Sequence, residues 1–187
     1  MGSPYNVRQL WSETEEGTDN ALWATPPEVF DKLNERFDFD LDAAATRDSA
    51  KCPLYFDENI DALSVSWDRP GVVREKGTHG DTWTSVPVDK MGAVFLNPPW
   101  GRGISRWLKK AYEESRKGVT VCCLIPSCTD TRYWRDYVWK AAEVTFMTGR
   151  VRFLQPDGTA KGPCPKGTAV VVFAAWSEGP PVCRLGL

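Results

Sequence analysis

The sequence contains little of what several common kinds of active site require. Its one histidine, His79, lies in a glycine-rich stretch, so a Ser-His or Cys-His catalytic pair would depend on that single side chain. The six cysteines include no C-x-x-C pair and two of them are adjacent, which suits neither a zinc site nor a disulfide framework. We therefore expect buried or incidental thiols, no metal site and no histidine-based nucleophile.

Long apolar runs are also missing. The longest, such as 169–176, is far shorter than the roughly 20 residues that span a bilayer. The sequence starts without a charged segment leading into an apolar signal core, and position 6 lacks the Ser or Thr of a myristoylation signal. With 187 residues and no internal repeat, the chain is expected to form one globular, cytoplasmic domain with no membrane partner.

Charge is distributed unevenly along the chain. Residues 1–68 carry 5 Lys and Arg against 15 Asp and Glu, whereas residues 69–187 carry 18 against 10. The net charge of −2 is therefore the sum of −10 and +8. A basic second half is suited to contact with phosphates, although folding mixes the two halves in space. The distribution favours a nucleic-acid partner.

The first third of the chain predicts an arm and the start of a folded domain. Residues 1–22 are polar and acidic without periodicity, so we expect a loose arm there and a single domain over 23–187. Thr25 followed by two prolines predicts a helix over 26–36, because Thr is a common N-cap and proline fits the first turn. Two short strands and an inserted loop rich in Gly, Pro and charge are expected over 39–45, 54–56 and 69–90.

After residue 92 the pattern alternates between strands and helices. Strands are predicted over 93–96, 119–125, 144–147, 151–154 and 169–176, with helices over 104–116 and 131–142. Ile104, Trp107 and Leu108 begin the apolar stripe of a helix packed on a sheet. The continuous apolar run at 119–125 indicates a strand buried on both faces. We therefore predict an α/β fold with a mixed, mostly parallel sheet and helices on both faces.

The segment Asn97-Pro98-Pro99-Trp100 lies between a predicted strand and a predicted helix, where ligands bind in open α/β sheets. The exocyclic amine of adenine is a poor nucleophile because its lone pair is conjugated into the ring. The Asn97 side-chain oxygen and the Pro98 carbonyl can accept its two hydrogens and turn the lone pair toward a methyl donor, while Trp100 stacks on a base rotated out of the duplex. The alternative is that Asn-Pro-Pro is only a turn that closes the strand.

Several further segments carry a resemblance to a known family. They are Trp23-Ala24-Thr25-Pro26-Pro27-Glu28-Val29, Phe39-Asp40-Leu41-Asp42-Ala43-Ala44-Ala45, Tyr55-Phe56 through Asp61 to Trp67, and Gly149-Arg150-Val151-Arg152-Phe153. With the N-P-P-W loop, they make residues 23–175 resemble the short, phage-type DNA adenine methyltransferases related to Dam, within the Rossmann-like methyltransferases that use an N/D-P-P-aromatic loop. The resemblance implies S-adenosylmethionine as methyl donor, and double-stranded DNA as partner with base flipping at adenine.

The resemblance also implies roles for individual residues. It assigns catalysis to Asn97, Pro98, Pro99 and Trp100, and cofactor binding to Trp23, Thr25, Pro26, Asp42, Ala43, Ala44, Asp57 and Asp61. The acid that holds the cofactor ribose is left open between Asp48 and Asp57. Two departures from the family pattern are Ala44-Ala45 in place of a Gly-rich turn and Trp100 in place of the commoner Tyr.

Basic residues near the loop and in the later part of the chain are candidates for contact with DNA phosphates, the alternative being that they are only solvated. They are Arg102, Arg106, Arg150, Arg152, Lys161 and Lys166.

Related functions use the same loop chemistry. Adenine in RNA and the glutamine side-chain amide of proteins are alternative substrates, and a third hypothesis is a DNA-binding relative without catalysis. A protein substrate is disfavoured by the basic second half and by the absence of a separate recognition domain. A pure DNA-binding protein would gain nothing from the amide of Asn97. The sequence leaves the oligomeric state open.

Overall fold

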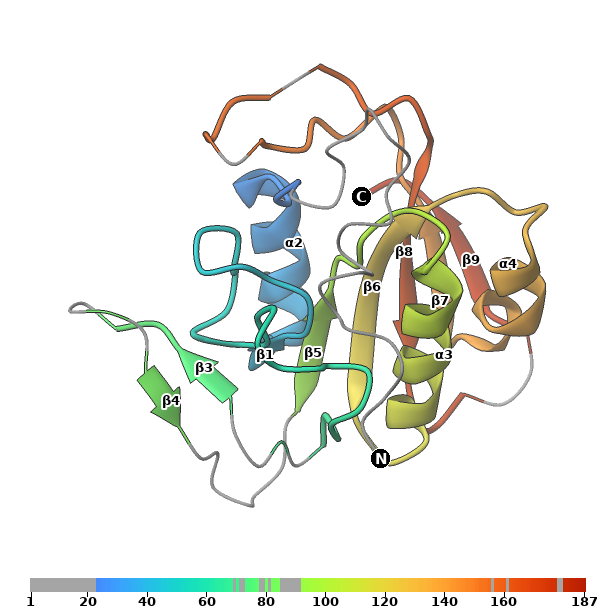
Figure 1. Ribbon diagram of the computed structural model, residues 1–187. Coiled ribbons are helices and arrows are strands. Elements are labelled where there is room, and N and C mark those ends of the chain that lie inside the picture. The colour runs from blue at the N-terminus through green and yellow to red at the C-terminus, as the bar shows by residue number, and fades with distance from the viewer. Residues whose placement is uncertain are drawn as a thin grey trace.

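The computed structural model describes residues 23–68, 70, 73–77, 80, 82–84, 92–155, 157–160, 162–177 and 180–187 (Figure 1). The predicted arm over 1–22 lies outside these residues. The helices are α2 (Pro27–Phe37), α3 (Ile104–Ser115) and α4 (Arg132–Asp136), with a 3-10 turn η2 (Val138–Lys140). The strands are β1 (Leu41–Asp42), β2 (Leu54–Tyr55), β3 (Val73–Glu75), β4 (Thr82–Thr84), β5 (Ala93–Leu96), β6 (Thr120–Pro126), β7 (Glu143–Phe146), β8 (Thr168–Phe173) and β9 (Val182–Leu185).

The strands form one nine-stranded sheet in the order β4-β3-β2-β1-β5-β6-β8-β7-β9. Pairing is parallel for β2 with β1, β1 with β5, β5 with β6 and β7 with β9. It is antiparallel for β2 with β3, β3 with β4, β6 with β8 and β7 with β8. The mixed α/β architecture is therefore confirmed, but the expected excess of parallel pairs is wrong. Periodicity reports which strands are buried and does not report their direction.

The side chains of the central strands alternate between two apolar clusters, because successive residues of a strand point to opposite faces. Val94 and Leu96 of β5 belong to one cluster, and Phe95 belongs to the other. The first cluster contains the α3 side chains Ile104, Trp107, Leu108 and Ala111, and the second contains the α2 side chains Val29, Phe30 and Leu33. α3 therefore buries its predicted apolar stripe against the central strands, and α2 buries its apolar side chains against their other face.

Several predicted elements differ from those in the structure. The helix expected over 131–142 ends at Asp136, because the Tyr137 backbone at φ −129° and ψ −52° leaves the helical region. The segment 151–154 is not a strand; its alternating burial is real, yet only Leu154 forms isolated bridges. The expected loop over 69–90 contains β3 and β4.

β9 was not predicted, because all four of its side chains are exposed and its sequence carries no alternation. Among the described residues, no helix has both the length and the apolar character needed to cross a membrane. The same part of the chain holds no cluster of His, Cys, Asp and Glu that could bind a metal ion.

A buried carboxylate joins α3 to the segment after β2. The Glu114 side chain is fully buried and accepts hydrogen bonds from the ammonium groups of Lys110 and Lys117 at 2.6 and 2.8 Å and from the amide of Trp67 at 2.9 Å. The Trp67 indole N–H donates to the Ala62 carbonyl at 2.7 Å. Burial alone would raise the pKa of Glu114, but these hydrogen bonds outweigh it and hold the pKa below its ordinary value of 4.5.

Glu114→Gln is expected to lower the free energy of unfolding at neutral pH by about 2–3 kcal/mol, because two ammonium groups lose a buried partner. The folded-state pKa is depressed, so this stabilisation is present above pH 4.5 and is lost as the pH falls through the folded-state pKa. Glu113→Gln is the matched control, since its ion pair with Lys109 is exposed and contributes less than about 1 kcal/mol. Urea denaturation at neutral and acidic pH measures both, and equal losses would contradict the prediction.

Candidate active site

The carboxyl ends of β1, β2, β5, β6 and β7 lie at one edge of the sheet, together with those of β4 and β9. β1, β2, β5 and β6 are parallel, and β7 points the same way because both β6 and β7 run antiparallel to β8. We call this the carboxyl edge. Ala24, just before α2, exchanges two backbone hydrogen bonds of 2.8 and 2.9 Å with Leu154, which follows β7. The residues that lead into α2 therefore also lie at the carboxyl edge.

Asn97 follows β5 directly and its side-chain amide is held in place. The Nδ2 group donates a hydrogen bond to the Trp23 carbonyl oxygen at 3.2 Å. This contact fixes the plane of the amide, so the Oδ1 atom keeps a defined direction as an acceptor. Pro98 and Pro99 are buried and further restrict the backbone of the loop. The Asn97 side chain therefore presents an oxygen acceptor of defined direction at the end of a central strand.

Trp100 is the last residue of the loop, and its side chain packs against the core. Its indole N–H donates to the Leu124 carbonyl at 3.3 Å, and its ring meets the Phe153 ring edge-on, with centroids 5.1 Å apart and an interplanar angle of 79°. Phe153 in turn stacks on Trp23, with centroids 6.2 Å apart. The Trp100 ring remains partly exposed. Stacking of a base on Trp100 stays a prediction.

Asp42 ends β1 beside this loop and is 3% exposed. Its two carboxylate oxygens accept hydrogen bonds from the amides of Ala44 at 3.3 Å and Lys51 at 3.1 Å. The Ala43 amide donates to the Phe95 carbonyl at 2.9 Å, which ties the turn after β1 to β5. Burial raises the pKa of Asp42 to about 6, against the opposing effect of the two amides. The carboxylate thus organises the turn that the sequence assigned to cofactor binding.

Asp57 and Asp61 follow β2 at the carboxyl edge, and both are engaged within the chain. The Asp57 carboxylate pairs with the Arg74 guanidinium at 3.1 Å and accepts two hydrogen bonds from Asn59 at 2.9 and 3.2 Å. Asp61 Oδ1 accepts from the Leu63 amide at 3.1 Å and forms a turn. Through these contacts both carboxylates stabilise the local structure. Their expected role in cofactor binding stays a prediction.

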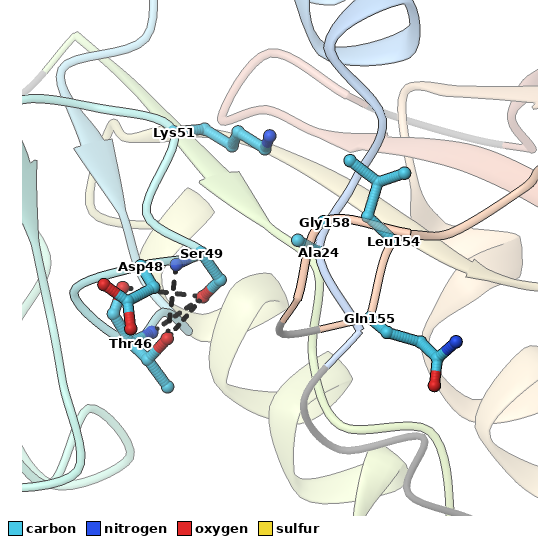
Figure 2. Close-up of a pocket in the computed structure, with 8 residues that line it drawn as sticks. All are labelled: Ala24, Thr46, Asp48, Ser49, Lys51, Leu154, Gln155 and Gly158. Atoms are coloured by element: carbon cyan, nitrogen blue, oxygen red, sulfur yellow. Dashed lines mark hydrogen bonds between the residues drawn. The ribbon is translucent and has the colours of Figure 1, made fainter. Parts of the chain in front are cut away.

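A cavity of about 330 Å³ opens at the carboxyl edge between two walls (Figure 2). The first wall is the loop after Asp42, and the second is formed by Ala24 and the segment after Phe153. The lining residues are Ala24, Thr46, Asp48, Ser49, Lys51, Leu154, Gln155 and Gly158. Thr46 and Ser49 are joined by hydrogen bonds, while Lys51 extends toward the second wall (Figure 2). The charged residues among those that line the cavity are Lys51 and Asp48.

The basic residues predicted to meet phosphates flank the same edge. Arg102 and Arg106 follow β5 and are exposed, and Arg150, Arg152 and Lys166 are exposed side chains of the connection between β7 and β8. The Arg150 guanidinium also donates to the Pro165 carbonyl at 2.8 Å, which closes that connection into a loop. Lys161 lies outside the described residues. Topology thus brings together basic residues that are far apart in the sequence.

Comparison with known proteins identifies the family of the chain. A family model described as DNA N-6-adenine-methyltransferase (Dam) matches residues 12–183. The chain belongs to this family. A protein of Escherichia phage T1 named DNA N-6-adenine-methyltransferase is 25% identical over 175 residues, which cover 84% of this chain and 64% of the phage protein. The chain therefore spans less than two thirds of the length of that relative.

Membership in the Dam family implies a methyl donor, and one buried residue at the carboxyl edge fits a bound ligand. Thr25 is 2% exposed, and within the described residues its hydroxyl has no hydrogen-bond partner. A buried hydroxyl without a partner is costly, and a bound polar group would remove that cost. The motif that contains Thr25 was assigned to the cofactor from the sequence, and the unpaired hydroxyl is consistent with that role.

Sequence reasoning missed four of the polar residues that line the cavity of this Dam family member: Thr46, Ser49, Lys51 and Gln155. The first three lie in the loop after Asp42, and loops after parallel strands are where ligands bind in α/β sheets. That signal was present in the sequence. Gln155 carried no such signal, because the segment that contains it is placed by the bridge between Leu154 and Ala24.

Asp42→Asn is expected to change how stability depends on pH. The folded-state pKa of Asp42 is about 6 against an ordinary value of 3.8, so its contribution to stability is present at low pH and is lost as the pH rises through 6. The variant lacks this titration. As the pH rises from 3.8 to 6, the free energy of unfolding of the variant should therefore increase by roughly 2–3 kcal/mol relative to that of the unmodified protein. Urea denaturation of both proteins at several pH values measures this, and a constant difference would refute it.

Proposed function

We propose that this Dam family protein transfers a methyl group from S-adenosylmethionine to the exocyclic N6 amine of adenine in DNA. The observation that carries the proposal is the Asn97 side chain, whose amide nitrogen is bound to the Trp23 carbonyl at the end of β5. This contact leaves Oδ1 as the acceptor, in a loop that adjoins the turn after Asp42. Family membership and the similarity to the phage T1 protein support the same reaction.

The residues of the loop have distinct parts in this reaction. Asn97 Oδ1 and the Pro98 carbonyl accept hydrogen bonds from the two amine hydrogens and direct the nitrogen lone pair outward. Because the Trp23 contact and the prolines hold both oxygens in advance, little reorganisation is needed when charge develops on the amine. Trp100 offers a partly exposed π-face for an unpaired base.

The cofactor is proposed to lie at the carboxyl edge, between the Asp42 turn and the Thr25 segment. When bound, S-adenosylmethionine supplies a methyl group activated by a sulfonium centre. Thr25 and Lys51 are suited to its carboxylate, and Asp48 is suited to its ribose hydroxyls, since Asp57 is already paired with Arg74. Asp42 holds the turn, because each of its oxygens accepts a hydrogen bond from a backbone amide, and each keeps a second lone pair that can accept from the cofactor.

The fold that supports this site is proposed to be Rossmann-like, with helices on both faces of the sheet. Successive residues of β5 alternate between a cluster that contains α3 and a cluster that contains α2. Since alternate residues of a strand point to opposite faces, this alternation supports one helix on each face. Ligand binding at the carboxyl edge is typical of such folds.

The DNA partner is proposed to be double-stranded, with the target adenine rotated out of the helix. An amine in a base pair is not accessible to a loop at the edge of a sheet, so the base must leave the stack. The exposed arginines beside the loop and between β7 and β8 are suited to the flanking phosphates. RNA adenine, protein glutamine and a DNA-binding role without catalysis remain the competing functions.

Asn97→Ala is expected to lower the methyl-transfer rate by about 10²–10³-fold, because removal of one preorganised hydrogen-bond partner costs that much in comparable sites. Binding of cofactor and DNA should persist. Asn97→Asp keeps an acceptor oxygen but loses the donor to the Trp23 carbonyl, so it should retain measurable activity below the unmodified rate. Mass spectrometry of nucleosides from DNA and RNA, and of glutamine-containing peptides, measures the product. If Asn97→Ala keeps the unmodified rate, the loop is only a turn and has no catalytic role. If only RNA or peptide is methylated, one of the competing functions is favoured.

Neutralising Arg102 and Arg106 is expected to weaken the salt dependence of DNA binding, by about 0.9 in the logarithmic slope for each phosphate that the protein no longer neutralises. Arg135→Gln is the control, because this exposed arginine on α4 pairs with Asp136. Fluorescence anisotropy of a labelled duplex over a range of salt concentrations measures the slope. A slope near zero in the unmodified protein would exclude DNA as the substrate.

A further inference from the structure

We propose that Phe153 is a positioning residue that supports the catalytic loop from both of its ends. This inference rests on the proposed function, because the loop positioned is the one that carries Asn97. Phe153 is remote from Asn97 in the sequence and is 4% exposed. Its ring contacts Trp100 after the loop and Trp23, whose carbonyl holds Asn97.

The contact with Trp100 fixes the far end of the loop. The two rings meet edge to face at 5.1 Å, a geometry in which the positive edge of one ring meets the negative face of the other. The Trp100 indole N–H is bound at the same time to the Leu124 carbonyl. The hydrogen bond fixes the position of one edge of the indole, and Phe153 limits its rotation about that edge.

The contact with Trp23 fixes the near end. Trp23 and Phe153 are stacked with an interplanar angle of 25°. The Trp23 carbonyl accepts the hydrogen bond from Asn97 Nδ2, so a movement of residue 23 changes the direction of Asn97 Oδ1. Phe153 therefore acts on the Asn97 amide through one intervening residue.

The backbone next to Phe153 makes this support rigid. Leu154 and Ala24 exchange two hydrogen bonds, so the residues that follow Trp23 and Phe153 form a short antiparallel bridge. Val151 and Phe153 are buried while Arg150 and Arg152 are exposed, which fixes the orientation of the segment although it is not a strand. The aromatic contacts and the bridge hold residues 23 and 24 against residues 153 and 154.

Phe153→Leu tests the inference, since leucine keeps an apolar side chain and removes the ring. The rate of methyl transfer in a single turnover, at saturating cofactor and DNA, is expected to fall by about 10- to 100-fold, because a small displacement of a positioned group has that effect. The dissociation constants for cofactor and DNA should change by a smaller factor than the rate. Phe153→Tyr keeps the ring and should restore most of the rate. The ¹⁵N indole resonance of Trp100 should shift in Phe153→Leu and return in Phe153→Tyr.

Phe173→Leu is the matched control, because Phe173 is equally buried on β8 but belongs to the other apolar cluster and contacts Tyr112. It should lose thermal stability comparably and keep the rate and the Trp100 resonance. If Phe153→Leu keeps the unmodified rate and resonance, Phe153 is only a core residue. If the unmodified protein makes no methyladenine while the Trp100 resonance still responds to Phe153→Leu, the proposed function fails and the positioning contact stands.

Discussion

The parallel pairing of β1 with β5 is the constraint on which the site depends. Asp42, the last residue of β1, is in register with Phe95, and the Ala43 amide continues the ladder to the Phe95 carbonyl. This register places the turn after Asp42 beside the loop that begins at Asn97. A shift by one residue would move Phe95 out of the cluster that contains α2 and point Asp42 away from the amides it binds, because neighbouring strand residues face opposite ways.

Backbone groups hold the polar side chains of this edge. Asp42 accepts from two amides, Asn97 donates to the Trp23 carbonyl, and Trp100 donates to the Leu124 carbonyl. Backbone partners are fixed by the sheet and cannot change rotamer, so the polar groups are oriented before any ligand arrives. Burial of the Asp42 carboxylate lowers the stability of the fold at neutral pH, since it raises the pKa of Asp42 to about 6. Loss of stability at a site with a functional arrangement is common.

Local sequence patterns predicted individual strands and helices, and they did not predict contacts between segments that are far apart in the sequence. β5 has its predicted bounds, and α3 buries the expected stripe, because both follow from apolar periodicity. The ion pair between Asp57 and Arg74 of β3 was not predicted, because the sequence did not reveal that strand. The bridge between Ala24 and Leu154 likewise joins segments with no shared pattern, so the second wall of the cavity was not foreseen.

The direction of β8 determines how the basic second half of the chain reaches the site. β7 ends at the carboxyl edge, and β8 starts there because it runs antiparallel to both β6 and β7. The connection between them therefore begins and ends at that edge, and it carries Arg150, Arg152 and Phe153. A β8 strand parallel to β7 would require this connection to cross the length of the sheet. The antiparallel pairs that the periodicity could not predict thus place exposed arginines at the carboxyl edge and bring Phe153 into contact with Trp100 of the N-P-P-W loop.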